Sequence, residues 1–404
     1  MRILHTSDWH IGQKLHGNDR DEEHELFFNW LIDYINEHEV DVLLVAGDIF
    51  DVGFPSNSAL KRYYSFLTHL VQTKCSHVII TGGNHDYIST LEAPADVLSA
   101  LNIHVIGGAK TSIEDEVIEI KRGEELECVI GAVPFLRDKD IRLINAGESY
   151  EEGMNAINEG IVKHYQTVAD AMSEYECPRI AMGHLNVYGA KVSESERDIH
   201  IGNLAGFRVT DFPAIFDYVA LGHIHRPQRM NETGTIRYSG SPIALSFSER
   251  SDQKKMILLD LDINGIQSIE SVEIPCFRRL ISFKGEFQQV AEQLASYKSQ
   301  SVLCDWAEVS IEEKQMDTTL SMQYEQLIEN INNENNNLQI VKPSLRFING
   351  DQSTVYEEHI SLSDLTITDV FDRLLDAGQV NGQDELKQTF TELLDGFYHQ
   401  IENE

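Results

Sequence analysis

Hydrophobic and polar positions follow two different rhythms along the first two-thirds of the chain. Short apolar runs, typical of buried strands, alternate with longer stretches that have the apolar period of amphipathic helices. The strand-like runs are Arg2–Thr6, Val40–Ala46, His77–Thr81, Val129–Val133, Arg179–Met182 and Tyr218–Leu221. The helical stretches between them include Glu22–Glu37, Asn57–Thr73 and Glu151–Tyr175. This alternation predicts a layered α/β domain over residues 1–275, whose sheet a final β-rich stretch, Ile236–Ile274, would close.

The pattern changes near Pro275, after which shorter elements follow one another closely. They read as strand, helix, strand, helix and strand, at Leu280–Phe283, Phe287–Tyr297, Asp305–Ile311, Thr318–Ile331 and Leu338–Phe347. This order predicts a smaller α/β cap domain over residues 276–350. The Asn-rich run Asn330–Gln339 is interpreted as a polar surface loop of this cap.

Residues 351–404 are predicted to form an acidic tail with two helical patterns. The tail holds 13 acidic and 2 basic residues, a net charge of −11. One apolar stripe consists of Phe390, Leu393, Leu394, Phe397, Tyr398 and Ile401, and a shorter one of Val370, Phe371, Leu374 and Leu375. Two interpretations remain open, because these stripes could pack on the cap or dock in the groove of a partner protein.

Composition narrows the class of protein. The chain has 42% hydrophobic and 24% charged residues, as globular proteins do. No apolar run is long enough to span a bilayer, and the first residues lead into a strand pattern without the features of a signal peptide. The five cysteines are scattered, with no C-x-x-C, which disfavours a disulfide framework or a zinc ribbon and favours a reducing cytoplasm.

The net charge of −34 bears on the substrate. A protein that grips nucleic acid unaided needs basic patches for the phosphates. This charge therefore favours either a small-molecule enzyme or a protein whose partner supplies much of the grip on DNA.

Metal-binding side chains follow five of the apolar strands. The segments are Thr6-Ser7-Asp8-Trp9-His10, Gly47-Asp48-Ile49-Phe50-Asp51, Gly82-Gly83-Asn84-His85-Asp86, Gly183-His184 and Gly222-His223-Ile224-His225. In α/β sheets, ligands bind outside the carboxyl ends of the strands, so these loops should converge on one crevice. A glycine before the polar residue lets the backbone turn sharply there.

The residue types indicate the chemistry. Asp8 and His10 are two positions apart, as are His223 and His225, so each pair can point the same way from extended backbone. Carboxylate, imidazole and amide ligands together suit Mn²⁺ or Fe²⁺ better than structural Zn²⁺. Two such ions about 3.5–4 Å apart can clamp a phosphodiester for in-line attack. Any one of the motifs is weak by itself, but all five in this order predict a dinuclear metal site.

The ordered motifs DxH, GDxxD, GNHD, GH and GHxH resemble those of the calcineurin-like metallophosphoesterases. Longer stretches resemble the SbcD family of bacterial nuclease subunits, relatives of the Mre-type nucleases. These stretches are HTSDWHIGQ, GDIFDVGFPS, VTDFPAIFDYVALGHIHRPQ and YSGSPIALSFSE. The resemblance runs from residue 1 to about residue 275 and continues more loosely through the cap. It implies a layered β-sandwich flanked by helices, with a smaller α/β cap and a C-terminal helical tail.

The resemblance also implies roles for individual residues. One metal ion would be held by Asp8, His10, Asp48 and His225, and the second by Asp48, Asn84, His184 and His223. His85 matches the family's non-ligand catalytic histidine, which protonates the departing 3′-oxygen, a task suited to imidazole. Asp86 would orient His85 or its loop. Asp51 stands where some archaeal relatives carry a second active-site histidine, so a role that rests on that histidine does not transfer here.

The residues around these motifs are interpreted as structural. His5 lies inside the first strand pattern and is expected in the core. Trp9, between two predicted ligands, is expected to pack its loop. Arg226 could touch a phosphate or be an ordinary surface residue.

The function implied by the resemblance is a Mn²⁺-dependent DNA nuclease with two Mn²⁺ ions per chain. It would act as a 3′→5′ exonuclease on duplex ends and an endonuclease on single strands and hairpins, in DNA repair, recombination and replication. The implied partner is an SbcC-like SMC/ABC ATPase, in a heterotetramer that contains a homodimer of this chain. We expect a cytoplasmic, nucleoid-associated protein with no membrane association.

Two other classes of function remain to be weighed. A stand-alone metallophosphodiesterase or phosphatase for nucleotides would fit the five motifs and the acidity. A non-catalytic scaffold would not need the intact set of ligands and His85.

Overall fold

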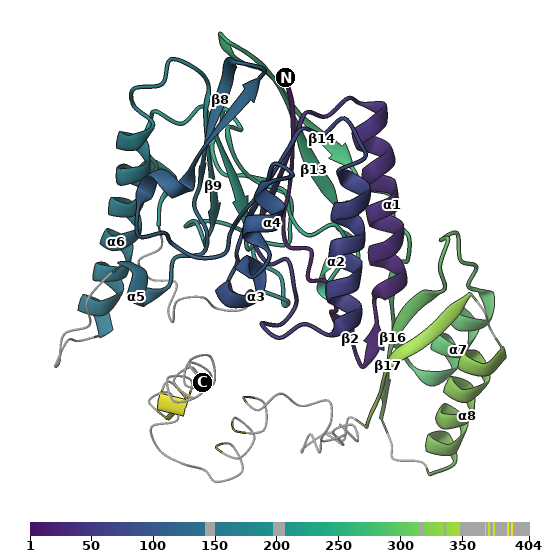
Figure 1. The fold of residues 1–404 in the computed structure, drawn as a ribbon. Helices are drawn as coiled ribbons and strands as arrows, with labels where there is room; N and C mark the ends of the chain where they lie inside the picture. Colours follow the sequence, from purple (N-terminus) through teal and green to yellow (C-terminus); the bar gives the residue numbers. More distant parts are fainter. Residues whose placement is uncertain are drawn as a thin grey trace.

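A computed structural model describes residues 1–141, 150–196, 207–314, 318–334 and 337–347, and the single residues 368, 371, 375, 386, 387, 389 and 390. Within them, two six-stranded sheets face each other, helices cover the outer faces, and a smaller three-stranded unit stands to one side (Figure 1). The predicted layered α/β fold is therefore confirmed. None of the described helices is long and apolar enough to cross a membrane.

The first sheet has the strand order β14-β13-β1-β4-β5-β6. Its strands are β1 (Arg2–Thr6), β4 (Val42–Ala46), β5 (His77–Thr81), β6 (Ile103–Ile106), β13 (Lys255–Asp262) and β14 (Gly265–Glu273). Strands β1, β4, β5 and β6 are parallel to one another, whereas β13 runs antiparallel to both β1 and β14. The carboxyl ends of β1, β4 and β5 consequently lie at the same edge.

The second sheet has the order β11-β12-β10-β9-β8-β7. Its strands are β7 (Val117–Arg122), β8 (Glu125–Ala132), β9 (Arg179–His184), β10 (Tyr218–Gly222), β11 (Gln228–Arg229) and β12 (Ile236–Tyr238). The prediction that the final β-rich stretch closes one sheet was wrong. That stretch is divided, because β12 pairs with β10 in the second sheet while β13 pairs with β1 in the first.

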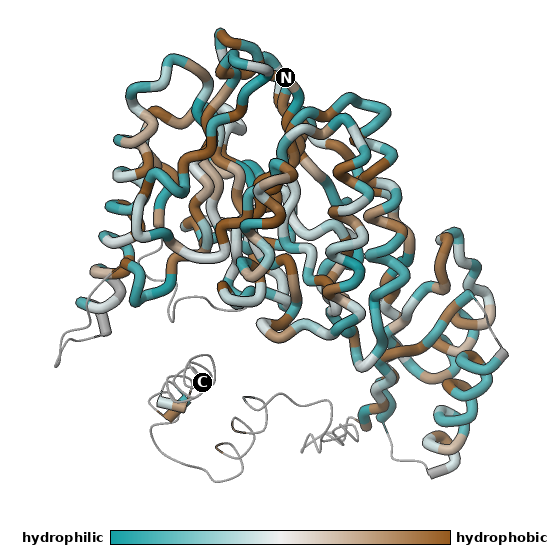
Figure 2. The backbone as a smooth tube through the Cα atoms, in the orientation of Figure 1, coloured by the Kyte–Doolittle hydropathy of each residue, from teal (hydrophilic) through white to brown (hydrophobic). Residues whose placement is uncertain are grey.

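Alternation along β4 shows how the layers are held together. Val42, Leu44 and Ala46 belong to the core between the two sheets, whereas Leu43 and Val45 belong to the core beneath the outer helices. Every residue of β4 is buried, as expected for a parallel strand covered on both faces. Figure 2 shows the hydrophobic positions along the central strands, with mixed colouring on the surrounding helices.

Helices α1 (Asp21–Glu37) and α2 (Asn57–Leu70) cover the first sheet, and α6 (Tyr150–Ala171) covers the second (Figure 1). The Ser56 hydroxyl caps α2 by accepting from the Ala59 N–H at 3.2 Å. Shorter elements complete this part: β2 (Lys14–Leu15), β3 (Asn18–Asp19), α3 (Ile88–Glu92), α4 (Ala95–Ser99) and α5 (Asp138–Ile141).

The smaller unit is a parallel sheet of order β15-β16-β17 with two helices. Its elements are β15 (Leu280–Gly285), α7 (Phe287–Ser296), β16 (Asp305–Glu313), α8 (Thr318–Glu334) and β17 (Leu338–Phe347). The prediction of a loop from Asn330 was wrong, since α8 continues to Glu334. The Asn332 amide receives the Ile340 N–H at 2.7 Å and donates to the Ile340 carbonyl at 3.1 Å, which ties the end of the helix to β17.

A buried joint connects this unit to the sandwich. The Trp306 ring lies under the guanidinium of Arg278, 4.2 Å from its centroid, and that of Arg20, at 5.4 Å. Both arginines donate to the buried carboxylate of Glu23. Arg20 also donates to the Ala244 carbonyl at 2.9 Å, so the joint reaches the loop after β12. Buried ion pairs of this kind depend on complete hydrogen bonding, which fixes their geometry.

The acidic tail lies mostly outside the described residues. Within them, the rings of Phe371 and Phe390 stack with centroids 3.9 Å apart and an interplanar angle of 8°. These two residues come from the two predicted apolar stripes, which thus meet each other at this point. Whether the stripes also contact the cap or a partner lies outside the described residues.

Candidate metal centre

Predicted ligands from both sheets gather at one edge of the sandwich. One group consists of Asp8, His10 and His225, and another of Asp48, His184 and His223. Within each group, one ligand atom per residue lies within 4.8 Å of the others, and all six side chains are buried. The loops after β1 and β4 thus meet those at the ends of β9 and β10.

Unusual backbone angles direct these side chains into the crevice. Asp8, His10, Asp48 and His223 have φ values of 53°, 46°, 49° and 96°. A non-glycine residue in this region costs on the order of 1–3 kcal/mol and persists only where its surroundings impose it. Those surroundings include backbone bonds between the loops, with the Asp8 N–H donating to the Gly47 carbonyl and the His10 N–H to the Asp48 carbonyl, both at 3.0 Å.

Two glycines allow the sheets to approach at the site. A Cβ on Gly47, which has a φ of 82°, would lie 2.0 Å from His184 Nδ1. A Cβ on Gly222 would lie 1.7 Å from the Ala46 carbonyl oxygen. Both distances are far below van der Waals contact, so only glycine fits without a shift of the backbone.

Asp48 lies between the two groups. Its Oδ2 is 3.5 Å from His10 Nε2 and 3.3 Å from His184 Nε2, while its Oδ1 accepts the His85 N–H at 2.9 Å. Asn84 lies on the same side as His184, with its Oδ1 3.0 Å from His184 Nε2 and 3.3 Å from His223 Nδ1. The seven residues predicted as ligands are therefore brought together.

Electrostatics of the cluster test whether cations fit. Burial lowers the pKa of His10, but the carboxylates of Asp51 and Asp48 outweigh it and raise this pKa to about 9. His184 behaves alike, since burial is outweighed mainly by Asp48 and its pKa rises to about 9. The raised pKa values show that the buried carboxylates create an excess of negative charge, which protonated imidazoles would offset. Divalent cations would supply positive charge in place of the protons, so the residues fit a metal centre.

His85 stands beside the cluster. Its Nδ1 lies 2.7 Å from the Asp51 carbonyl oxygen, a contact in which the ring nitrogen donates, and its ring is perpendicular to that of His10 with centroids 4.7 Å apart. His10, Asp51 and His85 also form a third group with metal-ligand spacing. The position accordingly allows an acid beside the metals or a further ligand.

Asp86 braces two of the loops rather than the His85 ring. Its carboxylate accepts the N–H groups of Ile49 at 3.0 Å, Phe50 at 3.0 Å and Gly83 at 2.9 Å. Burial, followed by the charge of Asp48, raises the pKa of Asp86 to about 6. These contacts favour the expectation that Asp86 orients the loop that carries His85.

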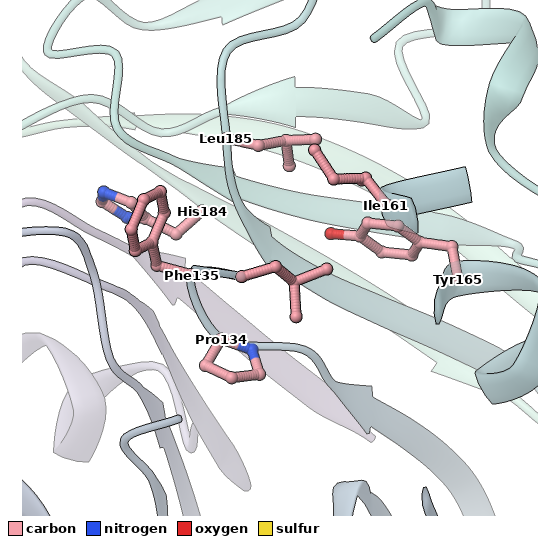
Figure 3. A pocket seen from close by; sticks show the side chains of 7 residues that line it. Pro134, Phe135, Ile161, Tyr165, His184 and Leu185 are labelled. Atoms are coloured by element: carbon pink, nitrogen blue, oxygen red, sulfur yellow. The ribbon is translucent and has the colours of Figure 1, made fainter. Parts of the chain in front are cut away.

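An apolar wall lies beside His184 (Figure 3). Pro134, Phe135, Leu136, Ile161, Tyr165 and Leu185 line this wall with His184, around a cavity of only about 10 Å³. The Phe135 ring stands perpendicular to the imidazole, with centroids 6.3 Å apart. His184 Nδ1 contacts the Ala46 carbonyl oxygen at 3.0 Å, which leaves Nε2 for the cluster.

Residues interpreted as structural are in the core or engaged by protein groups. His5 is buried and its Nδ1 contacts the Tyr218 hydroxyl at 3.0 Å, while Trp9 is buried against Phe28 and Phe66. The Arg226 guanidinium donates to Asp252 and to the Ser248 carbonyl, both at 2.9 Å. These contacts favour a structural role for Arg226.

The motifs did not reveal the residues that support the ligands. Ser7 donates to Asp8 Oδ2 at 2.5 Å, and Ser195 Oγ lies 2.7 Å from His225 Nδ1. Ser7 is at least part of the first motif. Ser195 lies 30 residues before His225 with no pattern around it, so only the folded chain reveals the contact.

Comparison with known proteins decides the family. Residues 1–227 match the calcineurin-like phosphoesterases, and residues 276–378 match a family described as the type 5 capsule protein repressor C-terminal domain. The chain is 33% identical over 401 residues to the SbcD subunit of nuclease SbcCD from Escherichia coli K12, covering 98% of each protein. The chain belongs to the SbcD family of nuclease subunits.

Other SbcD relatives agree. The SbcD subunit from Rhodobacter capsulatus is 38% identical over 272 residues, which cover 65% of this chain and 66% of that protein. The SbcD subunit from Bacillus subtilis is 31% identical over 287 residues, which cover 70% of this chain and 72% of that protein.

Among solved structures, a crystal structure of a dimetal phosphatase from Danio rerio has a TM-score of 0.39 at 11% identity, covering 68% of this chain and 99% of that one.

Membership of the SbcD family confirms the predicted enzyme class. The chain is a nuclease of the calcineurin-like phosphoesterase type, with His and Asp clusters suited to two metal ions.

Proposed function

We propose that the chain is a Mn²⁺-dependent DNA nuclease that hydrolyses phosphodiester bonds, as an exonuclease on duplex ends with 3′→5′ polarity and an endonuclease on single strands and hairpins. The observation that carries the proposal is the pair of buried ligand groups, in which Asp48 belongs to the second group and also lies near His10 of the first. Asp8, His10, Asp48 and His225 would hold one ion, and Asp48, Asn84, His184 and His223 the other. When bound, two ions would supply a water-derived nucleophile and positive charge to neutralise the phosphodiester.

His85 is the proposed general acid. It lies beside His10, and its Nδ1 is occupied by the Asp51 carbonyl at 2.7 Å, so a proton would leave from Nε2. That proton would go to the 3′-oxygen that departs from phosphorus. Asp86 supports the role by fixing the loop through three backbone N–H groups.

An SbcC-like SMC/ABC ATPase is the proposed partner. The proposed assembly is a heterotetramer that contains a homodimer of this chain, and its proposed location is the cytoplasm, in association with the nucleoid. The relatives are subunits of nucleases named SbcCD, which supports the partner. The net charge of −34 supports it as well, since acidic residues outnumber basic ones in this chain and a partner would supply further basic groups for the phosphates. We assign residues 1–275 to the nuclease domain, 276–350 to the cap and 351–404 to the docking tail.

Cleavage of a hairpin duplex in the presence of Mn²⁺ tests the function. We expect cleavage by the chain together with the ATPase and ATP, and weaker cleavage without them. The matched control replaces the hairpin with a nucleotide phosphodiester. Hydrolysis of the nucleotide alone would favour a stand-alone phosphodiesterase, the alternative that the acidity supports. The full ligand set argues against a non-catalytic scaffold.

Deletion of residues 384–404 tests the docking tail. Hydrolysis of a model diester should persist, because the deleted residues lie far along the chain from the ligands. Association with the ATPase, measured by co-purification and calorimetry, should weaken. Unchanged association would contradict the assignment of the tail.

A further inference from the structure

His225 differs from His184 in how it is held. His184 is oriented by a backbone carbonyl, that of Ala46, at 3.0 Å from Nδ1. His225 instead has its Nδ1 2.7 Å from the hydroxyl oxygen of Ser195, a half-buried residue. A side-chain contact can be removed by substitution, whereas a backbone carbonyl cannot.

Behind Ser195 stands a buried ion pair. The Ser195 hydroxyl donates to Glu249 Oε1, and Glu249 is fully buried. The other carboxylate oxygen, Oε2, accepts from Lys254 Nζ at 2.5 Å and from the Leu245 N–H at 3.2 Å. Lys254 is itself only 7% exposed, so the pair is shielded from water. A buried pair persists only when its hydrogen bonds are complete, and here they are directed at His225.

The same network binds the backbone of His225. Lys254 Nζ donates to the His225 carbonyl at 2.9 Å and to the Ser241 hydroxyl at 2.9 Å. The His225 N–H donates to Glu196 Oε1 at 2.8 Å. His225 is thus fixed at its amide, its carbonyl and one ring nitrogen.

Donor and acceptor roles follow from these contacts. Glu249 is a carboxylate that accepts from Lys254, so the Ser195 O–H points to Glu249 and the Ser195 oxygen is left as an acceptor. That acceptor requires a proton on His225 Nδ1. In the neutral imidazole, Nε2 then carries the lone pair, and a ligating histidine needs that lone pair for the metal.

We propose that Ser195 and Glu249 are positioning residues that fix the tautomer and orientation of His225 for the first of the two metal ions. This inference rests on the proposed function, because it assumes that Asp8, His10 and His225 hold that ion. It adds residues that lie in none of the five ligand motifs. The network acts on the first ion, since His184 and His223, which are assigned to the second ion alone, are held by other contacts.

Titration of the full-length metal-free chain with manganese(II) chloride tests the inference, with free Mn²⁺ measured by electron paramagnetic resonance. Wild-type chain should bind two ions. Ser195→Ala should raise one dissociation constant about 10–100-fold, the range typical of lost partners of ligating residues, and leave the other within about threefold. Ser195→Thr, which keeps the hydroxyl, should restore the first constant.

Two further variants separate positioning from general loosening. Ser248→Ala is the matched control, because the Ser248 hydroxyl accepts the Glu194 N–H at 3.2 Å in the same segment without contacting His225 in the described residues. It should leave both constants unchanged. Glu249→Gln should weaken the same ion as Ser195→Ala, and the double variant should add little, because both changes break one chain of contacts.

The outcomes distinguish the inference from the function beneath it. Unchanged constants in Ser195→Ala, or equal weakening in Ser195→Ala and Ser248→Ala, would overturn the positioning role while two ions in wild type leave the nuclease centre intact. Fewer than two ions in wild type would overturn the metal centre and the positioning role together.

Discussion

The sandwich and the cap both contain parallel strands connected by helices, yet only the sandwich brings groups with metal-ligand spacing together among the described residues. In the described residues, the groups with metal-ligand spacing all lie at the sandwich edge. There, β1 and β4 lead into loops with positive φ at Asp8, His10 and Asp48. In the cap, β15 ends at Gly285 and β16 at Glu313, with no ligand group among the described residues. Parallel strands alone therefore do not gather the ligand groups. The loops with positive φ at the sandwich edge direct these side chains toward one another.

The largest effect is expected for Asp48→Ala. Asp48 is the side chain between the two ligand groups, so its loss should remove hydrolysis below detection and release Mn²⁺ from both positions. Hairpin cleavage and metal titration measure the two effects. Circular dichroism is the check on folding, and retained binding of two ions would show that the groups do not depend on Asp48.

His85→Ala should separate chemistry from metal binding. Loss of a general acid costs about 10²–10⁴-fold in rate, and two Mn²⁺ ions should stay bound. Single-turnover cleavage and metal titration give both readouts. Loss of an ion in this variant would instead assign His85 to the third group, with His10 and Asp51.

Acid should weaken the sandwich more than the cap. Burial lowers the pKa of His24 to about 4 from 6.5. The folded pKa is depressed, so this histidine contributes stability above about pH 6.5, and that stability is lost as the pH falls toward 4. The loss is at most about 3.5 kcal/mol, at about 1.4 kcal/mol per pKa unit.

Urea unfolding at pH 7.5 and 5 measures this dependence. His24→Gln cannot take up a proton in this range and should reduce the dependence, of which buried His5, whose pKa burial lowers to about 3, retains a part. His69→Gln, at an exposed position of α2, should leave the dependence unchanged. Residues 276–350 contain no histidine, so the cap has no equivalent group. An equal pH dependence in both variants would exclude His24 as a source.

The smallest effect is expected for the cap residue Asp305. Its buried carboxylate accepts the Tyr297 hydroxyl at 2.6 Å and the Arg279 N–H at 2.7 Å. Asp305→Asn should lower the free energy of unfolding by about 1–3 kcal/mol, since it disturbs two buried hydrogen bonds. Mn²⁺ binding should not change. A loss of metal affinity would show that the cap carries part of the site.

The sequence predicted some strands with their exact bounds, among them the cap strand β17, and missed others. Apolar runs defined β1 and β5 with the bounds that the structure has. Strands β6 and β7 were missed, because β6 has four residues and β7 alternates apolar and charged positions. The division of the last β-rich stretch between two sheets depends on pairing between distant strands, which local periodicity does not encode.

The site was predictable to the extent that its residues lie in motifs. Asp8, Asp48 and His223 each follow a strand in a pattern with family resemblance. Ser195 lies outside these stretches, and Glu249, although it ends the stretch YSGSPIALSFSE, carries no metal-ligand motif. Their role depends on contacts across 30 and 54 residues. The Asn-rich run was assigned to a loop from its composition, but two hydrogen bonds of Asn332 to β17 favour helix at that point.

The bond from the His223 N–H to Asp8 Oδ1, at 2.8 Å, joins residues 215 positions apart. We expect a loop of that length to close late in folding, because closing it costs conformational entropy before its stabilising contacts have formed. We therefore expect the crevice to form only after the two sheets have packed against each other. A cation held there would bind the finished fold and not the early intermediates, and it would slow unfolding without speeding folding. Bound metal would therefore indicate that the two sheets of the chain have folded and packed together.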